Sequence, residues 1–324
     1  MINLPAPFAP LVSDGSGLDR YPAEPSALAV RMAQVYGLPV EQVLPVRGLS
    51  HGLELVWRLC ARDGRSVTAP EAQPYAGLAA IYARPGAQGE AGAVVIRALG
   101  SPEAVAEMAA RVAPALLVVD EGLIEFSDAA SASEVIGDHA NLVVLRSLSL
   151  AYGLAGARIG AALAQPATLA RLAAMLEPYA LPEPSVRLAL QALDPSRMVE
   201  TAQRIATVRA ERDRLAAALG RVMTIEAGVG PVLMARPGDL AATRAALDKF
   251  GVAVGPSGDR LRLPVTIRPE VNDRLLTALG VGPAPRRAAR TGEAVRDTKE
   301  TRIVCTVDLD APGPVAIHTG VGFF

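Results

Sequence analysis

The spacing of apolar residues along the chain predicts alternating strands and helices. An apolar run at 115–119 that ends in Asp120–Glu121, and a run of branched apolar residues at Leu142–Leu145, are typical of strands buried in a parallel sheet. Amphipathic spacing predicts a helix at about Ser26–Tyr36, and a longer helix is predicted over Ser196–Leu219. Strands alternating with helices in this way indicate an α/β fold.

Length and composition narrow the class of protein. A chain of 324 residues can bury one large core and a smaller one, so two domains are expected. A formal net charge of −1 and a hydrophobic content of 51% indicate a globular protein without electrostatic attraction to nucleic acid. No apolar run is long enough to span a bilayer, and the first residues lack the pattern of a signal peptide. Cys60 and Cys305 lie far apart and suggest neither a disulfide nor a metal site. A cytoplasmic location is therefore expected.

One stretch combines the residue types of an anion site. The strand at Leu142–Leu145 leads into a loop that contains Ser147 and Ser149, followed by a glycine-rich segment with Arg158. Hydroxyl groups, loop amides and one guanidinium group can converge on a phosphate. The alternative is an ordinary strand–loop–helix connection that binds nothing.

The same stretch, RSLSLAYGLAGARIG at 146–160, resembles the signature of fold-type I pyridoxal-phosphate aminotransferases. It is most similar to that of histidinol-phosphate aminotransferase. The resemblance implies a large domain with a mostly parallel sheet between helices, followed by a smaller α/β domain. The family's Schiff-base lysine is replaced by Leu150, so the resemblance implies no catalytic residue in this chain.

Two further segments align with the family. The segment 47–56 matches its phosphate-binding helix start, which implies that the backbone amides at Leu49 and Ser50 hold a phosphate. His51 replaces an acidic residue there and is expected to be a solvated loop histidine. Asp120 matches the aspartate that pairs with the cofactor's pyridinium nitrogen. The alternative for Asp120 is a structural, hydrogen-bonded carboxylate.

Two other residues are implied to bind ligands. Tyr21 precedes a proline, as does a family tyrosine that reaches the cofactor phosphate of the partner subunit, so a homodimer is implied. Arg262 falls on the arginine that binds the anionic end of the substrate. The alternatives are a packed loop tyrosine and a strand-edge arginine.

Several family positions are altered besides the lysine. The asparagine loop is replaced by 98–100 (Ala-Leu-Gly). The stacking aromatic is absent, because 70–72 (Pro-Glu-Ala) stand at its motif and the nearby Tyr75 is out of register. The chain's two lysines are Lys249 and Lys299, outside the region expected to form a cofactor pocket. Pyridoxal phosphate would therefore be held non-covalently at most.

The carboxyl-terminal segment resembles the start of a second family, imidazoleglycerol-phosphate dehydratase. It shares Arg296, Thr298, Lys299–Thr301 and Thr319–Phe324 with that family, and two alternating strands are predicted within it. Glu300 matches an active-site glutamate, but one residue cannot form a metal site. We expect an amino-terminal arm at 1–24, a large domain at 25–190, a small domain at 191–281, a linker at 282–291 and a partial dehydratase-like β segment at 292–324.

Three functions agree with these features. The first is a catalytically impaired aminotransferase relative of histidine biosynthesis that binds a phosphorylated small molecule. The second is a non-catalytic scaffold or fusion partner of a dehydratase. The third is a lysine-independent transaminase that uses pyridoxal or pyridoxamine phosphate.

Overall fold

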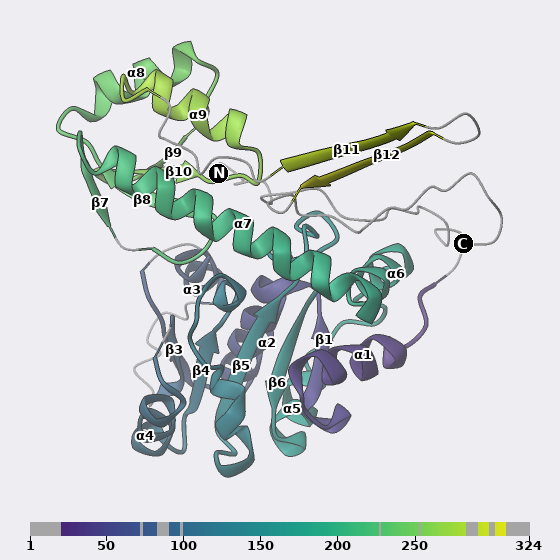
Figure 1. The fold of residues 1–324 in the computed structure, drawn as a ribbon. Helices are drawn as coiled ribbons and strands as arrows, with labels where there is room; N and C mark the ends of the chain where they lie inside the picture. Colours follow the sequence, from purple (N-terminus) through teal and green to yellow (C-terminus); the bar gives the residue numbers. More distant parts are fainter. Residues whose placement is uncertain are drawn as a thin grey trace. The chain divides into compact units, whose positions relative to one another are not determined.

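The computed structural model describes residues 21–71, 74–82, 91–97, 100–226, 228–252, 254–282, 291–297 and 302–308 (Figure 1). The predictions for the amino-terminal arm before Tyr21, for the loop at 98–99, for most of the predicted linker 282–291 (residues 283–290), for Thr298–Thr301 and for Thr319–Phe324 lie outside these residues. The described chain forms two compact units. The first unit holds the residues up to Met198 together with Gly228–Pro231, and the second holds the remaining residues from Val199 on.

The first unit is built on a six-stranded sheet with the order β1-β6-β5-β4-β3-β2. The strands β2 to β5 are parallel, and β6 runs antiparallel between β5 and β1. This arrangement confirms the predicted α/β fold with a mostly parallel sheet. The strands are β1 (Val43–Val46), β2 (Ser66–Thr68), β3 (Ala91–Ile96), β4 (Leu116–Asp120), β5 (Leu142–Ser147) and β6 (Gly160–Ala164).

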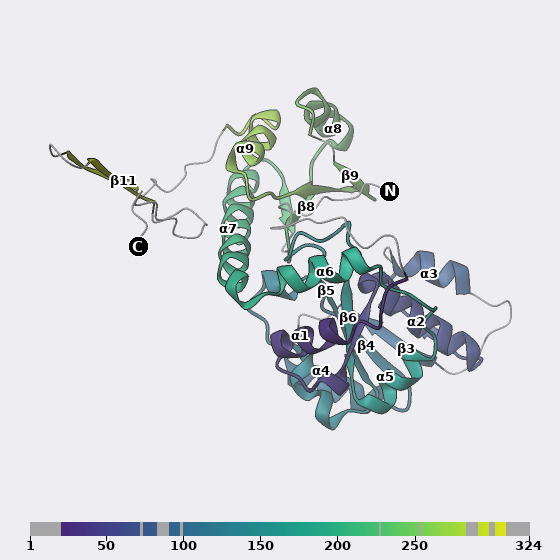
Figure 2. The same ribbon diagram turned by 90° about the vertical axis from the view of Figure 1, so that its right-hand side faces the viewer.

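Helices cover both faces of this sheet (Figure 2). On one face, α2 packs with α3 and α5 against alternate buried strand residues such as Val143 and Leu145, and forms an apolar core. On the other face lie α1 and α4 (Figure 2). The 3-10 helix η3 contacts α4 and the strands β5 and β6. The elements are α1 (Ser26–Tyr36), η1 (Val40–Gln42), α2 (Gly48–Arg62), α3 (Tyr75–Tyr82), α4 (Pro102–Val112), η2 (Ile124–Phe126), η3 (Ala132–Asp138), α5 (Pro166–Ala173) and α6 (Glu183–Ala192).

Strand direction gathers the candidate site residues at one edge of the sheet. The parallel strands β4 and β5 end there with Asp120 and Ser147, and β1, antiparallel to β6, ends there just before α2. The antiparallel strand β6 begins at the same edge, because Gly160 pairs with both Ser147 and Val46. The carboxyl edge of parallel strands is where α/β proteins bind ligands.

The second unit contains a smaller sheet with the order β7-β8-β10-β9 and the helices α8 and α9. The two strands predicted in the carboxyl-terminal segment form an antiparallel hairpin, in which Thr291 pairs with Asp308 and Asp297 with Arg302. The long helix α7 (Pro195–Leu219) begins in the first unit and continues into the second. The other elements are β7 (Thr224–Glu226), β8 (Val232–Arg236), α8 (Leu240–Lys249), β9 (Gly255–Ser257), β10 (Arg260–Pro264), α9 (Pro269–Ala278), β11 (Thr291–Asp297) and β12 (Arg302–Asp308).

Within the described residues, no helix has the length and apolar character needed to cross a bilayer.

Candidate functional site

The start of α2 lies against Arg158 at the carboxyl edge of the sheet. A Cβ placed on Gly48 would lie 2.9 Å from one terminal guanidinium nitrogen of Arg158 and 3.3 Å from its Cζ. Gly48 adopts a left-handed φ of 74°, and the side chain of the N-cap residue Arg47 makes no capping hydrogen bond. The first backbone N–H groups of a helix lack intrahelical acceptors and carry partial positive charge. This end of α2 therefore presents amides and a guanidinium group together.

The loop before β6 positions Arg158. Its φ of 57° lies in the left-handed region, which is uncommon for a residue other than glycine. The guanidinium group donates to the carbonyl oxygen of Ala155 at 3.1 Å, and the side chain is exposed. The arrangement holds Arg158 beside Gly48 while leaving it open to solvent, as a site for a soluble anion requires.

The segment with Ser147 and Ser149, at the end of β5, lies near the start of α2 because both contact Gly160. The backbone of Gly48 lies 3.2 Å from the place of a Cβ on Gly160, whose strand partner is Ser147. Ser147 is buried, and its hydroxyl accepts from the backbone N–H of Ser149 at 3.1 Å. The backbone amides of Gly48, Leu49 and Ser50, with Ser147, Ser149 and Arg158, are called the anion corner below.

Asp120 borders the anion corner. A Cβ placed on Gly122 would lie 2.7 Å from Leu49 Cδ1, 3.1 Å from Asp120 Oδ1 and 3.8 Å from Ser147 Cβ. The structure thus brings together six residues that the sequence predicted from three separate segments: Leu49, Ser50, Asp120, Ser147, Ser149 and Arg158. Their ligand-binding roles remain predictions.

Asp120 makes contacts within the chain through both carboxylate oxygens. Oδ1 accepts from the backbone N–H of Gly122 at 2.9 Å, and Oδ2 accepts from the hydroxyl of Tyr75. Arg97 Nε donates to the same hydroxyl at 3.2 Å and lies 3.8 Å from Oδ2. Sequence alignment placed Tyr75 out of register and assigned it no role. Its position at the start of α3, after the carboxyl end of β2, was the signal that could have found it.

A second polar network fixes the first turns of α2 and removes Arg47 from the anion corner. Glu177 accepts from Arg47 at 2.5 Å, from Arg58 at 3.1 Å and lies 3.2 Å from His51 Nε2. Burial raises the pKa of Glu177, but a backbone N–H, His51 and Arg47 together lower it to about 2. Arg47 is thus paired with a carboxylate, which leaves Arg158 as the cation of the anion corner.

The expectation that His51 is a solvated loop residue is wrong. His51 lies within α2 and is 2% exposed. Its Nδ1 accepts from the backbone N–H of Arg47 at 3.0 Å. Burial lowers the pKa of His51 below its usual range, although Glu177 opposes this effect. Its side chain therefore caps the backbone as a neutral ring and supplies no charge to an anion.

Leu150, which the resemblance predicts to stand at the family's lysine position, lies in the turn after β5. Leu150 is half-buried there, and its carbonyl accepts from the N–H of Gly153 at 3.4 Å. Lys249 ends α8 in the second unit, and the first unit has no lysine in its sequence from Met1 to Met198. The first unit therefore offers no ε-amino group for covalent attachment of an aldehyde.

The two remaining predicted residues lie elsewhere in the chain. Tyr21 is 80% exposed, and its ring stacks on Tyr179 with a centroid separation of 4.7 Å. Arg262 is an exposed residue of β10 in the second unit. Their predicted roles toward a partner subunit and a substrate stay predictions.

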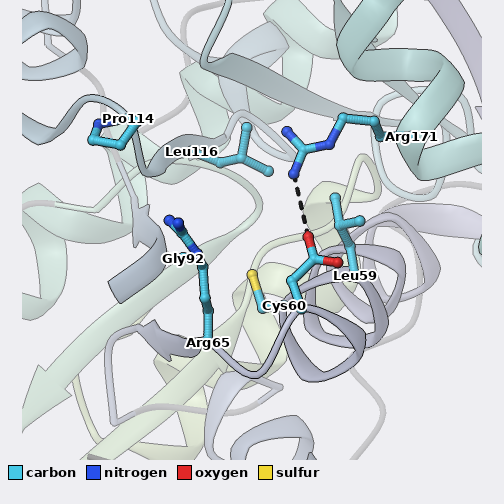
Figure 3. A pocket seen from close by; sticks show the side chains of 8 residues that line it. Leu59, Cys60, Arg65, Gly92, Pro114, Leu116 and Arg171 are labelled. Atoms are coloured by element: carbon cyan, nitrogen blue, oxygen red, sulfur yellow. Dashed lines mark hydrogen bonds and ion pairs between the residues drawn. The ribbon is translucent and has the colours of Figure 1, made fainter. Parts of the chain in front are cut away.

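A cavity of about 570 Å³ opens at the opposite edge of the sheet (Figure 3). Arg65 and Arg171 extend into it from different elements, and Arg171 pairs with Asp63 at 3.4 Å. Cys60 contributes to its wall, and burial raises the pKa of this thiol to about 11. None of the predicted site residues lines this cavity, so it is separate from the anion corner.

Comparisons with known proteins agree with the fold and the signature. The model of the family "Aminotransferase class I and II" matches residues 99–279. Histidinol-phosphate aminotransferase of Stenotrophomonas maltophilia is 36% identical, over 86% of this chain and 87% of its own length. The enzyme of the same name from Xanthomonas campestris pv. campestris is 36% identical, over 80% and 84%.

Solved structures show the same architecture. Histidinol-phosphate aminotransferase of Sinorhizobium meliloti, solved with pyridoxal-5′-phosphate, has a TM-score of 0.66 at 22% identity, covering 86% of this chain and 89% of its own. A putative histidinol-phosphate aminotransferase of Erwinia carotovora atroseptica has a TM-score of 0.69 at 18% identity, over 81% and 87%. These likenesses establish the fold-type I architecture. The chain therefore belongs to the class I and II aminotransferase family, as a relative of the histidinol-phosphate aminotransferases.

Proposed function

We propose that this chain is a catalytically impaired member of the histidinol-phosphate aminotransferase group that binds a phosphorylated small molecule without covalent attachment. The observation that carries this proposal is Leu150 at the lysine position. In the family's chemistry, that lysine is both the covalent anchor and the base that moves the proton. Loss of a positioned general base alone costs roughly 10²–10⁴ in rate. Leu150 can supply neither function.

The anion corner supports phosphate binding. Backbone N–H groups at the start of α2 are donors that side-chain replacement does not remove. Arg158 adds a permanent positive charge, and Ser147 and Ser149 add hydroxyl groups. These groups come from the connections that follow β1 and β5 and precede β6, so the sheet itself holds them in place.

The surroundings of Asp120, where the cofactor ring would lie, fit pyridoxal phosphate less well than the anion corner fits its phosphate. Asp120 would have to pair with a pyridinium nitrogen, but its Oδ2 already accepts from Tyr75 and its Oδ1 from Gly122. The Leu49 side chain adds an apolar group beside Oδ1. We therefore assign phosphate binding to this chain and derive no step of transamination.

The exposed aromatic pair supports a homodimer. Tyr21 and Tyr179 are 80% and 61% exposed although their rings stack, so the pair offers aromatic surface of the kind that is enriched at interfaces. A second copy of the chain would bury both rings and bring Tyr21 toward the partner's anion corner. Sedimentation of the native protein and of Tyr21→Ala tests this, with a weaker dimer expected for the variant.

Two assays test the proposed function. The protein is mixed with pyridoxal phosphate, reduced with borohydride and digested, and the modified peptides are identified by mass spectrometry. No peptide of the first unit should carry the cofactor. Transamination of histidinol phosphate is then measured with and without Asp120→Ala. Measurable transamination that this variant abolishes would contradict the proposal and favour the lysine-independent enzyme.

The carboxyl-terminal hairpin favours the scaffold as a second candidate function. Strands β11 and β12 pair over their full lengths, yet a two-stranded hairpin is marginally stable alone. A dehydratase subunit could extend this sheet by adding a strand to an edge. Co-purification of an imidazoleglycerol-phosphate dehydratase with the full chain, lost on deletion of 291–324, would support it. No association would argue against it.

A further inference from the structure

Tyr75 is held against the carboxylate of Asp120 by several contacts. It is 0% exposed, and its hydroxyl donates to Asp120 Oδ2. Arg97 Nε donates to the Tyr75 oxygen at 3.2 Å, and the Arg97 Cζ lies 5.5 Å from the centroid of the tyrosine ring. The hydroxyl therefore both donates and accepts, and its ring also contacts a cation.

The charge of Asp120 is already balanced within this cluster. Arg97 Nε lies 3.8 Å from Oδ2, so a permanent cation stands where a ligand would otherwise supply one. Burial raises the pKa of Tyr75, and the neighbouring Asp120 raises it further. The tyrosine therefore keeps its proton at neutral pH and remains a hydrogen-bond donor to the carboxylate.

Little of the Asp120 carboxylate is open to a ligand. The Asp120 side chain is 10% exposed, and Oδ1 accepts from Gly122 beside the Leu49 side chain. A pyridinium nitrogen that donated to Oδ2 would have to share this oxygen with the Tyr75 hydroxyl or displace the tyrosine. That displacement would leave a buried hydroxyl without its acceptor, which is unfavourable.

We propose that Tyr75 acts as a specificity residue, because its hydroxyl occupies the place beside Asp120 that a pyridinium nitrogen needs. The pocket therefore binds phosphate monoesters that lack a cationic ring as readily as it binds vitamin B6 phosphates. This inference rests on the proposed function, because the ligand is held at the anion corner. In this inference, Asp120 has a structural role in which it pairs with Arg97 and Tyr75, and it does not recognise a cofactor.

The test compares two phosphate monoesters by calorimetric titration. Pyridoxine 5′-phosphate carries the ring but has no aldehyde, so it cannot react with an amine, and glycerol 3-phosphate carries no ring. Both are titrated into the native protein, Tyr75→Phe and Tyr75→Ala. Tyr82→Phe is the matched control on the same helix, since its hydroxyl bonds Glu54 instead. Thermal unfolding of each variant establishes that it is folded.

In the native protein, the two dissociation constants should agree within about threefold, because the ring gains no charge-assisted hydrogen bond. At least one Tyr75 variant should bind pyridoxine phosphate roughly tenfold more tightly and leave glycerol phosphate unchanged, as expected for a freed carboxylate. Tyr82→Phe should change neither constant.

Two results would overturn the inference. One is a native protein that already binds pyridoxine phosphate tenfold more tightly than glycerol phosphate. The other is a pair of folded Tyr75 variants that gain no preference for the ring. If neither ligand binds the native protein, the proposed function fails; the inference then stands only if a Tyr75 variant gains binding of pyridoxine phosphate.

Discussion

The guanidinium group of Arg158 lies directly against Gly48, where a Cβ would come within 2.9 Å of a guanidinium nitrogen. A loop arginine with a φ of 57° and a helix-start glycine with a φ of 74° thus meet at the edge of the sheet. Glycine is needed at this helix start for two reasons: its φ is left-handed, and the space for a side chain is already filled. The contact places the cation beside the free amides of α2.

Gly48→Ala should therefore damage both stability and ligand binding. The left-handed backbone should lower the free energy of unfolding by about 1–2 kcal/mol, and the new methyl group should displace Arg158. Gly156→Ala, in the loop that carries Arg158, is the matched control, because its Cβ would meet nothing within 4 Å. Urea unfolding measures the difference. Equal stability of the two variants would contradict the described contact.

Leu150→Lys should not restore transamination. The added amine would reach a pocket in which Asp120 is paired with Tyr75, and the sequence resemblance predicts that the family's asparagine loop and stacking aromatic are also replaced. Histidinol phosphate turnover should remain at the level of the native chain. Robust turnover by this single variant would show that the rest of the catalytic machinery is intact.

The contribution of His51 to the stability of the protein should rise with pH between about pH 5 and 7. Burial lowers the pKa of His51, so the unfolded state binds a proton at a pH where the folded state does not. His51 therefore lowers the free energy of unfolding as pH falls below the ordinary histidine pKa, and it has no effect on this free energy above that pH. His51→Gln should flatten this slope in urea unfolding, whereas His139→Gln, a half-buried histidine elsewhere, should keep it. A slope unchanged in His51→Gln would contradict the assignment.

Cys60 should react slowly with thiol reagents. Because burial raises its pKa to about 11, the thiolate fraction at pH 8 should be roughly 10²-fold below that of a free cysteine. The measurement uses Cys305→Ser, so that Cys60 is the remaining cysteine, with the unfolded protein as the positive control. A native rate equal to the unfolded rate would show that the thiol is open to solvent.

The sequence predicted the main elements because their signals are local. Branched apolar runs identified β4 and β5, and amphipathic spacing placed α1 at its observed bounds, Ser26–Tyr36. The strand β6 gave no such signal, because Gly160–Ala164 reads GAALA and alanine and glycine favour strands weakly. Its strand conformation depends on the neighbours β1 and β5, which no local pattern reveals.

The site was predictable where it follows strand ends and unpredictable where it depends on loop paths. Asp120, Ser147 and Arg158 converge because strand direction brings their segments to one edge. Tyr75, the first residue of α3, lies beside Asp120 because of where α3 begins after β2, and residue spacing alone does not predict that place. His51 was misassigned for a related reason, since its burial depends on the distant Glu177.

The most direct test of the central claim is a calorimetric titration of the native protein with pyridoxal phosphate, repeated with Arg158→Ala. Arg111→Ala, an exposed arginine of α4, is the matched control. We predict saturable binding that Arg158→Ala weakens roughly 10- to 100-fold, as expected for loss of a charge-assisted hydrogen bond to phosphate, and that Arg111→Ala leaves unchanged. No saturable binding, or binding that Arg158→Ala does not weaken, would contradict the account.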